Sequence, residues 1–216
     1  MRILIIFFLL FSCLGCVSTQ VKSHTDTKYA TYQIKSIAIL ALSDDVGLSG
    51  AIEKNLSEKF TAIGVNTVLS QDILPPTRQY TMDEIKDAFI SRGIYSLLIV
   101  DVGGSIQSSD VVGYQSYGRA YGSAYGNAYT VGNTTYAHAS GSASSTNTTV
   151  PIRRFQRDTI TYTTIYNVAS TDVIWIAQTE TKAGGALFIS DTSTGDDLAS
   201  KIIQELIEKG HLPANN

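Results

Sequence analysis

Residues 117–144 read YGRAYGSAYGNAYTVGNTTYAHASGSAS, a stretch rich in tyrosine, glycine, alanine and serine. The tetrad Tyr-Gly-x-Ala occurs three times, and a fourth tyrosine follows at the same spacing; the four are Tyr117, Tyr121, Tyr125 and Tyr129. Side chains alternate between the two faces of a strand. The stretch therefore predicts a strand with one aromatic and polar face and one face of glycine and alanine.

The second half of this stretch continues the alternation in the opposite phase, with Tyr136 on an even position. A two-residue turn at Gly132-Asn133 explains the change of phase, because such dipeptides are typical of tight hairpin turns. The turn pairs Val131 with Thr134, and in that register the small residues of both strands share one face. We therefore predict a long β-hairpin. The alternative is a disordered, low-complexity insertion.

Alternating strands and helices precede the predicted hairpin. Continuous apolar runs indicate buried strands, and apolar residues at helical spacing indicate helices between them. Thr81 and Glu84 have the spacing of a capping box, and Gly64 and Gly93 stand where helices end. The predicted elements are a strand over 35–42, a helix over 48–63, a strand over 65–69, a helix over 81–93 and a strand over 95–102. This β-α-β-α-β order favours right-handed crossovers and parallel pairing.

The chain after the hairpin predicts two more strands, 159–168 and 173–181, which a short turn joins as an antiparallel pair. A closing helix is expected over about 196–209, with Gly210 at its end. The predicted class is α/β (α+β). Its β-α-β-α-β opening, hairpin insertion at about 107–155, antiparallel strand pair and C-terminal helix surround one mixed sheet.

The amino terminus has the pattern of a signal peptide, because an apolar run over residues 3–11 follows Met1-Arg2 and is too short to span a bilayer. Its end resembles the lipobox of bacterial lipoproteins, in which a small residue precedes a cysteine that becomes lipidated. Cys16 leaves a signal peptide of residues 1–15 and is the preferred lipidation site. Cys13 is the alternative, although its signal peptide would be short. A plain secretory signal with two incidental cysteines is a third interpretation.

Residues 16–34 are polar and show no periodicity, which predicts a flexible tether. The tether would join the lipid anchor to a single domain over residues 35–216. By the sorting rule of bacterial lipoproteins, the absence of aspartate after Cys16 implies the outer membrane. The domain would then lie on the periplasmic face, attached through its lipid.

The sequence shows no pattern of a catalytic, metal or cofactor site. The net charge of −3 provides no field that would favour nucleic acid. His24, His138 and His211 lack a cysteine or carboxylate at metal-ligand spacing. Nucleophile-elbow, P-loop and dinucleotide-binding motifs do not occur. We therefore predict a protein that is not an enzyme and has neither a metal nor a cofactor.

The tyrosines of the hairpin are the candidate binding residues. Aromatic faces bind sugars and partner proteins, so partner binding is assigned to the hairpin tyrosines: Tyr117, Tyr121, Tyr125, Tyr129 and Tyr136. The alternative is a structural role, in which cross-strand tyrosine pairs stiffen the ribbon.

The order of elements, together with the closing segments TYTTIYNV at 161–168 and VIWIA at 173–177, resembles bacterial lipoproteins with the TolB amino-terminal-like fold. The curli secretion channel subunit and the lipoprotein of Pel polysaccharide export belong to that group. The resemblance covers residues 35–209. It implies a non-catalytic envelope protein in which hairpins or loops grafted on the α/β core carry the function.

Two functions compete on these grounds. The first is a membrane-anchored periplasmic lipoprotein that serves as a subunit or accessory of an envelope or export assembly, with envelope proteins or further copies of itself as partners. The second is an envelope module that binds carbohydrate or peptidoglycan through its tyrosine face. An enzyme is the third and least supported class.

Overall fold

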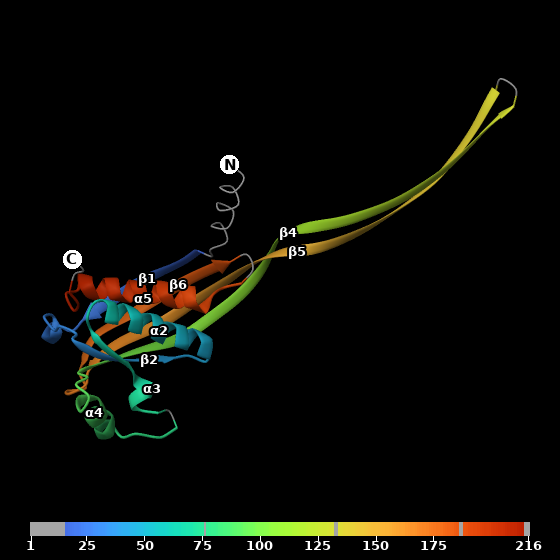
Figure 1. Ribbon diagram of the computed structural model, residues 1–216. Coiled ribbons are helices and arrows are strands. Elements are labelled where there is room, and N and C mark those ends of the chain that lie inside the picture. The colour runs from blue at the N-terminus through green and yellow to red at the C-terminus, as the bar shows by residue number, and fades with distance from the viewer. Residues whose placement is uncertain (1–15, 76, 132–133, 186–187, 214–216) are drawn as a thin grey trace. The chain divides into compact units, whose positions relative to one another are not determined.

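The computed structural model describes residues 16–75, 77–131, 134–185 and 188–213, with the side chains of Met82 and residues 124–139 outside that description. Its elements are β1 (Cys16–Thr25), η1 (Thr27–Tyr29), β2 (Ser36–Leu42), α2 (Val46–Ala62), β3 (Asn66–Leu69), α3 (Ser70–Ile73), α4 (Met82–Ile90), β4 (Ser96–Val131), β5 (Thr134–Asn167), β6 (Val173–Gly185) and α5 (Asp191–Glu208). The described strands form one sheet in the order β1-β6-β5-β4-β2-β3 (Figure 1). The predicted fold class and its arrangement around one mixed sheet are confirmed.

The chain divides into two compact units. The core unit contains the residues up to Ser109 and those from Phe155 onward, and the hairpin unit is Asp110–Arg154. Strands β4 and β5 belong to both units, because each is continuous from the sheet into the hairpin. The sequence predicted separate strands at 95–102 and 159–168. In the structure these segments are the core ends of two longer strands.

Strand pairing in the core unit follows the predicted pattern. β2 pairs in parallel with β3 and with β4, and β5 pairs antiparallel with β6. The capping box at the start of α4 is present: the Thr81 amide donates to Glu84 Oε2 at 2.8 Å, and the Glu84 amide donates to Thr81 Oγ1 at 3.3 Å. Gly64 ends α2 with φ +83°, a left-handed conformation that glycine adopts without steric cost.

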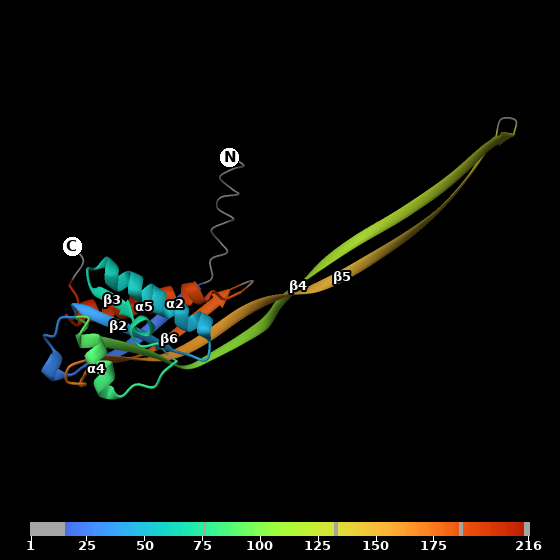
Figure 2. The same cartoon turned by 60° about the horizontal axis from the view of Figure 1, so that its bottom comes forward.

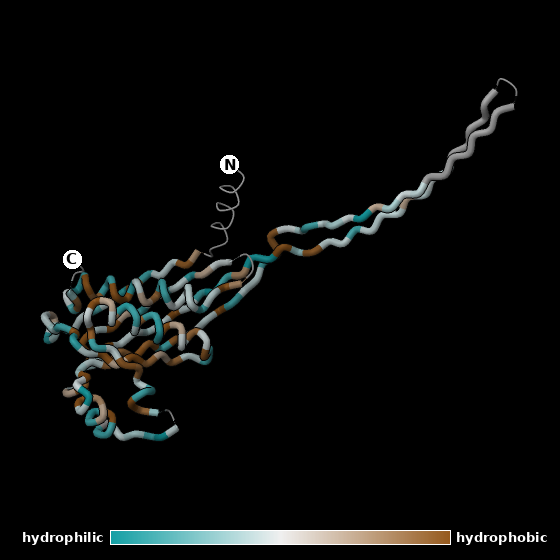
Figure 3. The backbone as a smooth tube through the Cα atoms, in the orientation of Figure 1, coloured by the Kyte–Doolittle hydropathy of each residue, from teal (hydrophilic) through white to brown (hydrophobic). Residues whose placement is uncertain are grey.

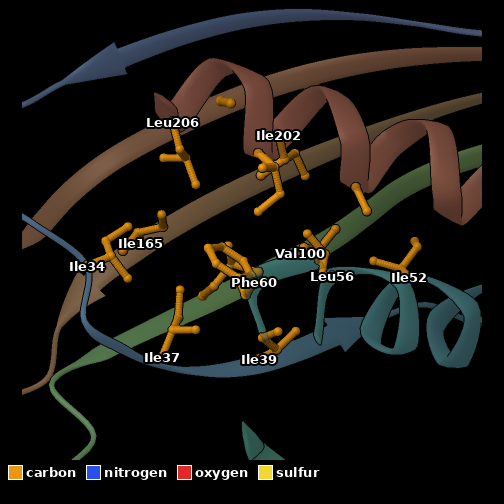
Figure 4. Close-up of a cluster of buried hydrophobic side chains, with 14 of the residues drawn as sticks. Ile34, Ile37, Ile39, Ile52, Leu56, Phe60, Val100, Ile165, Ile202 and Leu206 are labelled. Atoms are coloured by element: carbon orange, nitrogen blue, oxygen red, sulfur yellow. The ribbon is translucent and has the colours of Figure 1, made fainter. Parts of the chain in front are cut away.

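Helices α2 and α5 cover one face of the sheet (Figures 1 and 2). Apolar side chains of β2 and β4 point towards those of α2, as Figure 4 shows for Ile39, Val100 and Phe60. The fully buried large side chains include Trp175, Phe60, Ile37, Ile39, Leu48, Ile52, Leu56, Leu98 and Ile165. At about 1.5–3 kcal/mol for each buried large apolar side chain, this layer is the main source of stability in the core unit.

The opposite face of the sheet is only partly covered. Helix α4 packs over its β2–β4 side, where Ala38, Phe89, Ile94 and Val168 form a second, smaller core. On the β5 side the same face carries Ile160 and Tyr162, which are 40% and 49% exposed. Among the described residues, the apolar surface of this face is therefore not fully buried.

Threonines form the inner face of β5. Thr159, Thr161 and Thr163 are buried, whereas the isoleucine and tyrosine that alternate with them face outward. The sequence predicted two unlike faces for this strand without deciding which one is buried. The buried hydroxyls pair across strands: Thr161 with Thr179, and Thr19 with Thr181 at 2.8 Å. The paired hydroxyls reduce the cost of burying these polar side chains, whereas Thr163 Oγ1 is buried without a hydrogen-bond partner among the described residues.

The prediction of a flexible tether over residues 16–34 is wrong. Residues 16–25 form β1, which pairs antiparallel with β6 from Cys16 opposite Gly184 to Thr25 opposite Trp175. The short helix η1 follows. The strand was missed because its inward positions are occupied by valine alternating with threonine and serine, and the apolar content is too low to indicate burial. Its stability comes from pairing and from side-chain hydrogen bonds instead.

His211 connects this N-terminal segment to the C-terminal end of the described chain. The side chain is fully buried. Its Nδ1 lies 2.9 Å from the Tyr32 carbonyl oxygen, so Nδ1 carries the proton and donates, and Nε2 accepts from the Thr25 hydroxyl at 3.0 Å. Both ring nitrogens are therefore used to hold residues that the sequence analysis assigned to a tether.

Helix α5 begins at Asp191, five residues earlier than the predicted start near 196. Ser190 is the N-cap, and its hydroxyl accepts a hydrogen bond from the Ser193 amide at 3.3 Å. The buried Arg157 pairs with Asp191 and lies 3.8 Å from Asp45, the N-cap of α2. One arginine thus connects the amino ends of both covering helices, a long-range contact that helix periodicity does not reveal.

We predict that the contact between η1 and the β5–β6 turn opens in acid. Hydrogen bonds from Lys28 and then Tyr29, both 2.6 Å from Asp172 Oδ2, and from Ser170 lower the Asp172 pKa from 3.8 to about 2. A lowered pKa stabilises the folded contact above pH 3.8, and this stabilisation is lost as the pH falls towards 2. Amide hydrogen exchange at Lys28 and Tyr29 should accelerate over this interval. In Asp172→Asn these two amides should exchange fast at every pH, whereas in Asp87→Asn, a control on α4, they should exchange as in the wild type. If the exchange in Asp172→Asn still accelerates below pH 3.8, Asp172 is not the group that responds to acid.

Candidate interaction site on the hairpin unit

Two contacts between side chains fix the register of the hairpin unit. The Ser116 and Thr149 hydroxyls lie 3.1 Å apart, and those of Ser123 and Ser142 lie 3.3 Å apart. In the register predicted from the two-residue turn, the two residues of each pair lie directly opposite each other on the two strands. The turn itself lies outside the described residues. The predicted register is therefore confirmed by contacts well away from it.

One face of the hairpin unit carries small residues close to one another. A Cβ added at Gly122 would lie 3.9 Å from the Ala143 Cβ, and one added at Gly118 would lie 2.6 Å from Asn147 Oδ1. These four residues define the small face. Gly118 makes room for the Asn147 side chain, so a larger residue there would displace it. The alternation of small residues places this face as the sequence predicted.

The opposite face carries exposed aromatic and aliphatic side chains. Tyr117 and Tyr121 are four residues apart on one strand, hence on one face, and are 57% and 65% exposed. Val111, Val150 and Ile152 lie exposed on the same face. These five residues define the tyrosine face.

Only part of the tyrosine face was predicted from the sequence. The tyrosines were identified, whereas Val111, Val150 and Ile152 were missed, although the spacing by two of Val150 and Ile152 indicated that these two share a face. The side chains of the other predicted binding residues, Tyr125, Tyr129 and Tyr136, lie outside the described residues. Tyr114, which was not predicted, is exposed on the opposite face.

Solvent reaches both faces of the described hairpin. Every described side chain in residues 110–123 and 140–154 is exposed, apart from the half-buried Gly113. The hydropathy of this ribbon is mostly neutral or hydrophilic, with short hydrophobic segments (Figure 3). Two exposed faces along an extended ribbon suit recognition by contacts spread over several residues.

Cys16 is exposed and is the first residue of β1. An exposed thiol at the start of an edge strand is accessible to modification, in contrast to a buried core cysteine. Cys13 lies outside the described residues. The predicted lipidation at Cys16 stays a prediction.

The described residues contain no cluster of three or more histidine, cysteine, aspartate or glutamate side chains that could hold a metal ion. His24 lies on β1 and His211 in the core unit, where its two nitrogens are occupied by Thr25 and Tyr32. The His138 side chain is outside the described part of the chain. Among the described helices, none is both long and apolar enough to cross a membrane.

No family model and no curated protein matches the sequence. Among solved structures, the chain is similar to the PelC dodecamer from Paraburkholderia phytofirmans, with 12% identity and a TM-score of 0.46 over 92% of this chain and 100% of that one. A point variant of the PelC dodecamer gives 13% identity and a TM-score of 0.43, covering 94% and 100% of the two chains. A PDZ domain protein from Parabacteroides distasonis gives 10% identity and a TM-score of 0.32, covering 98% of this chain and 39% of that one.

The features of this chain that bear on its function are the exposed Cys16, the small face and the tyrosine face.

Proposed function

We propose that this protein is a non-catalytic lipoprotein on the periplasmic face of the bacterial outer membrane, where it serves as a subunit of an envelope assembly. The hairpin unit is the part that binds neighbouring copies or another envelope protein. The lipobox at Gly15-Cys16 supports the anchor, and the exposure of Cys16 at the start of β1 is compatible with it.

The observation that carries the proposal is the exposure of both faces of the hairpin unit. A two-stranded ribbon without a covering layer is marginally stable in water. Ordering its backbone costs about 1–2 kcal/mol per residue, and the four residues of the small face have little apolar area to offset that cost. A partner that covers the ribbon would supply the missing burial. The ribbon therefore has the properties of a surface that binds a partner.

The two faces suit different roles in such an interface. Small side chains allow another backbone to approach closely, as in stacked sheets, so we assign contacts between copies to the small face. Tyrosine and aliphatic side chains bury more area and can also accept or donate hydrogen bonds through their hydroxyls. The tyrosine face is therefore assigned to the envelope partner.

Deleting the hairpin tests the proposal. Replacing residues 110–154 with an Asn-Gly turn should convert the assembled protein to a monomer, as measured by light scattering coupled to size exclusion. The melting temperature of the core unit should change little, because the buried residues of its main core lie outside the hairpin unit. Light scattering that shows the same assembled mass for the deletion and wild type would refute the proposal.

A matched pair of substitutions separates the two faces. Gly122→Trp places a large side chain on the small face and should block assembly. Ser123→Trp places the same side chain one residue further, on the other face, and should leave assembly intact. Equal effects of the two substitutions would show that the small face has no special role.

The second candidate is a glycan-binding module, favoured by the exposed pair Tyr117 and Tyr121. A wild-type protein that is monomeric in solution and co-sediments with purified peptidoglycan sacculi would support it. In that case Tyr117→Ser with Tyr121→Ser should abolish sedimentation, as should deletion of the whole hairpin. Sedimentation that persists in the deletion would contradict this candidate.

A further inference from the structure

A cavity of about 560 Å³ lies in the core unit, on the sheet face opposite α2 and α5. Its floor is formed by Leu40 and Leu42 of β2 and by Leu97 and Ile99 of β4. These residues lie at alternate positions of adjacent parallel strands, so their side chains project from the same face. The volume is within the range of about 300–1,000 Å³ found for small-molecule sites.

Three segments form the walls of the cavity. Helix α4 contributes Ile85, Lys86 and Phe89, and the segment between α3 and α4 contributes Arg78 and Tyr80. The turn after β5 contributes further side chains, including Val168 and Thr171. Most of the lining residues are therefore aliphatic or aromatic, and two of the others, Arg78 and Lys86, are cationic.

The floor of the cavity is not an ordinary part of the core. Leu40, Leu97 and Ile99 are only half-buried, and Leu42 is 46% exposed. Covering this apolar surface would contribute about 25 cal/mol for each Å² removed from water. Helix α4 lies beside this apolar floor but does not cover it. A hydrophobic ligand could therefore bind there.

The charged side chains among the described residues that line the cavity are both positive. No aspartate or glutamate is among the residues that line it. Lys86, which is half-buried on α4, and Arg78 make no ion pair with the described residues. A cation beside a surface of low polarity attracts an anion more strongly than it would in water. The cavity therefore selects a ligand with an apolar body and a negative head.

The turn that forms one lip of the cavity is held in a fixed and unusual conformation. Thr171 has φ +62°, which is rare for a β-branched residue. Asn167 Oδ1 accepts hydrogen bonds from the Ala169 and Ser170 amides at 2.9 and 3.1 Å, and the Thr171 amide donates to the Asn167 carbonyl at 2.8 Å. Strained residues persist where their surroundings hold them, and they often line ligand sites. The lip is thus preformed.

We propose that this cavity binds a free fatty acid, with its carboxylate at Lys86 and Arg78 and its hydrocarbon chain along Leu40, Leu97 and Ile99. The floor of leucine and isoleucine favours a hydrocarbon chain over a sugar. The volume suits a single small ligand, which favours one chain over a phospholipid with two. This site is separate from the hairpin unit and does not depend on the assembly proposed above.

Photo-crosslinking of the full-length protein in phosphatidylcholine nanodiscs tests the proposal. The probe is a long-chain fatty acid with a diazirine in its chain, and the crosslinked peptides are mapped by mass spectrometry. Crosslinks should concentrate on the peptides that line the cavity. The matched fatty alcohol, which lacks the charge, should crosslink about tenfold less, the scale of a lost charge-assisted contact.

Variants then assign the site. Lys86→Gln with Arg78→Gln should reduce crosslinking by the acid about tenfold, and Leu42→Trp, at a partly exposed floor position, should reduce it by filling the cavity. Lys54→Gln removes a cation from the exposed face of α2, far from this cavity, and should have no effect. Crosslinks spread over the whole surface, equal labelling by acid and alcohol, or displacement of the probe by phosphatidylglycerol as effective as that by oleate would each overturn the proposal.

Discussion

Replacing Cys16 with alanine should leave the precursor uncleaved and remove fatty-acid labelling completely. Only the thiol can accept the lipid, so its loss is an all-or-none change, and the uncleaved precursor keeps its apolar segment over residues 3–11 but lacks the acyl chains of the lipid anchor. Metabolic labelling with an alkynyl fatty acid, followed by gel electrophoresis, measures both effects.

Cys13→Ala is the matched control for this experiment, because it removes the competing cysteine of the same signal peptide. Labelling should persist in Cys13→Ala and disappear in Cys16→Ala. The reverse pattern would transfer the lipidation site to Cys13. If the double variant still incorporates the fatty acid, the lipoprotein hypothesis is wrong.

Gly195→Val should destabilise the core unit by about 3 kcal/mol, the upper end of the usual cost of overpacking. Gly195 lies where α5 contacts α2: a Cβ added there would be 2.9 Å from the Ala51 carbonyl carbon and 3.0 Å from its oxygen. Both atoms belong to the backbone, so the new side chain can be accommodated only if the two helices separate. Urea denaturation followed by circular dichroism measures the loss.

Gly50→Val provides the control for helix propensity and for the branched side chain. Gly50 is also a helical glycine, on α2, but an added Cβ there would meet nothing within 4 Å. Its stability should change by less than about 1 kcal/mol, the scale of helix-propensity differences. Equal destabilisation by the two substitutions would mean that the close approach of α2 and α5 does not determine the stability.

Much of the fold could be predicted from the sequence because its signals are local. The capping box at Thr81 and Glu84, the glycine that ends α2 and the alternation along the hairpin each involve only a few neighbouring residues. The hairpin register followed from the phase change across a two-residue turn. Such signals survive folding because tertiary contacts reinforce them.

The parts that were missed depend on contacts between distant residues. β1 is too polar to indicate burial, and its place in the sheet is set by β6, whose paired residues lie 150 to 168 positions further along the chain. The early start of α5 depends on Ser190 and on the pairing of Asp191 with Arg157. The cavity is formed by β2, β4, α4 and the turn after β5, so it exists only once these segments are assembled.

The tyrosine face was predicted only in part, because some of its residues are brought together by strand pairing alone. The tyrosines repeat every four residues and are easy to detect, whereas Val111, Val150 and Ile152 occur in short segments without a repeat. Only the pairing of the two strands shows that these aliphatic residues share a face with Tyr117 and Tyr121.

The uniform alternation of the hairpin has a consequence for its length. The core ends of β4 and β5 are held by pairing with β2 and β6, and these contacts do not involve the hairpin unit. Inserting one Tyr-Gly-x-Ala tetrad in β4 and four alternating residues in β5 would extend the ribbon by about 13 Å at the usual rise per residue. Every side chain would keep its face, and the anchored ends would keep their register. The length of the ribbon can therefore change in steps of whole repeats while the strand pairing of the core unit stays the same.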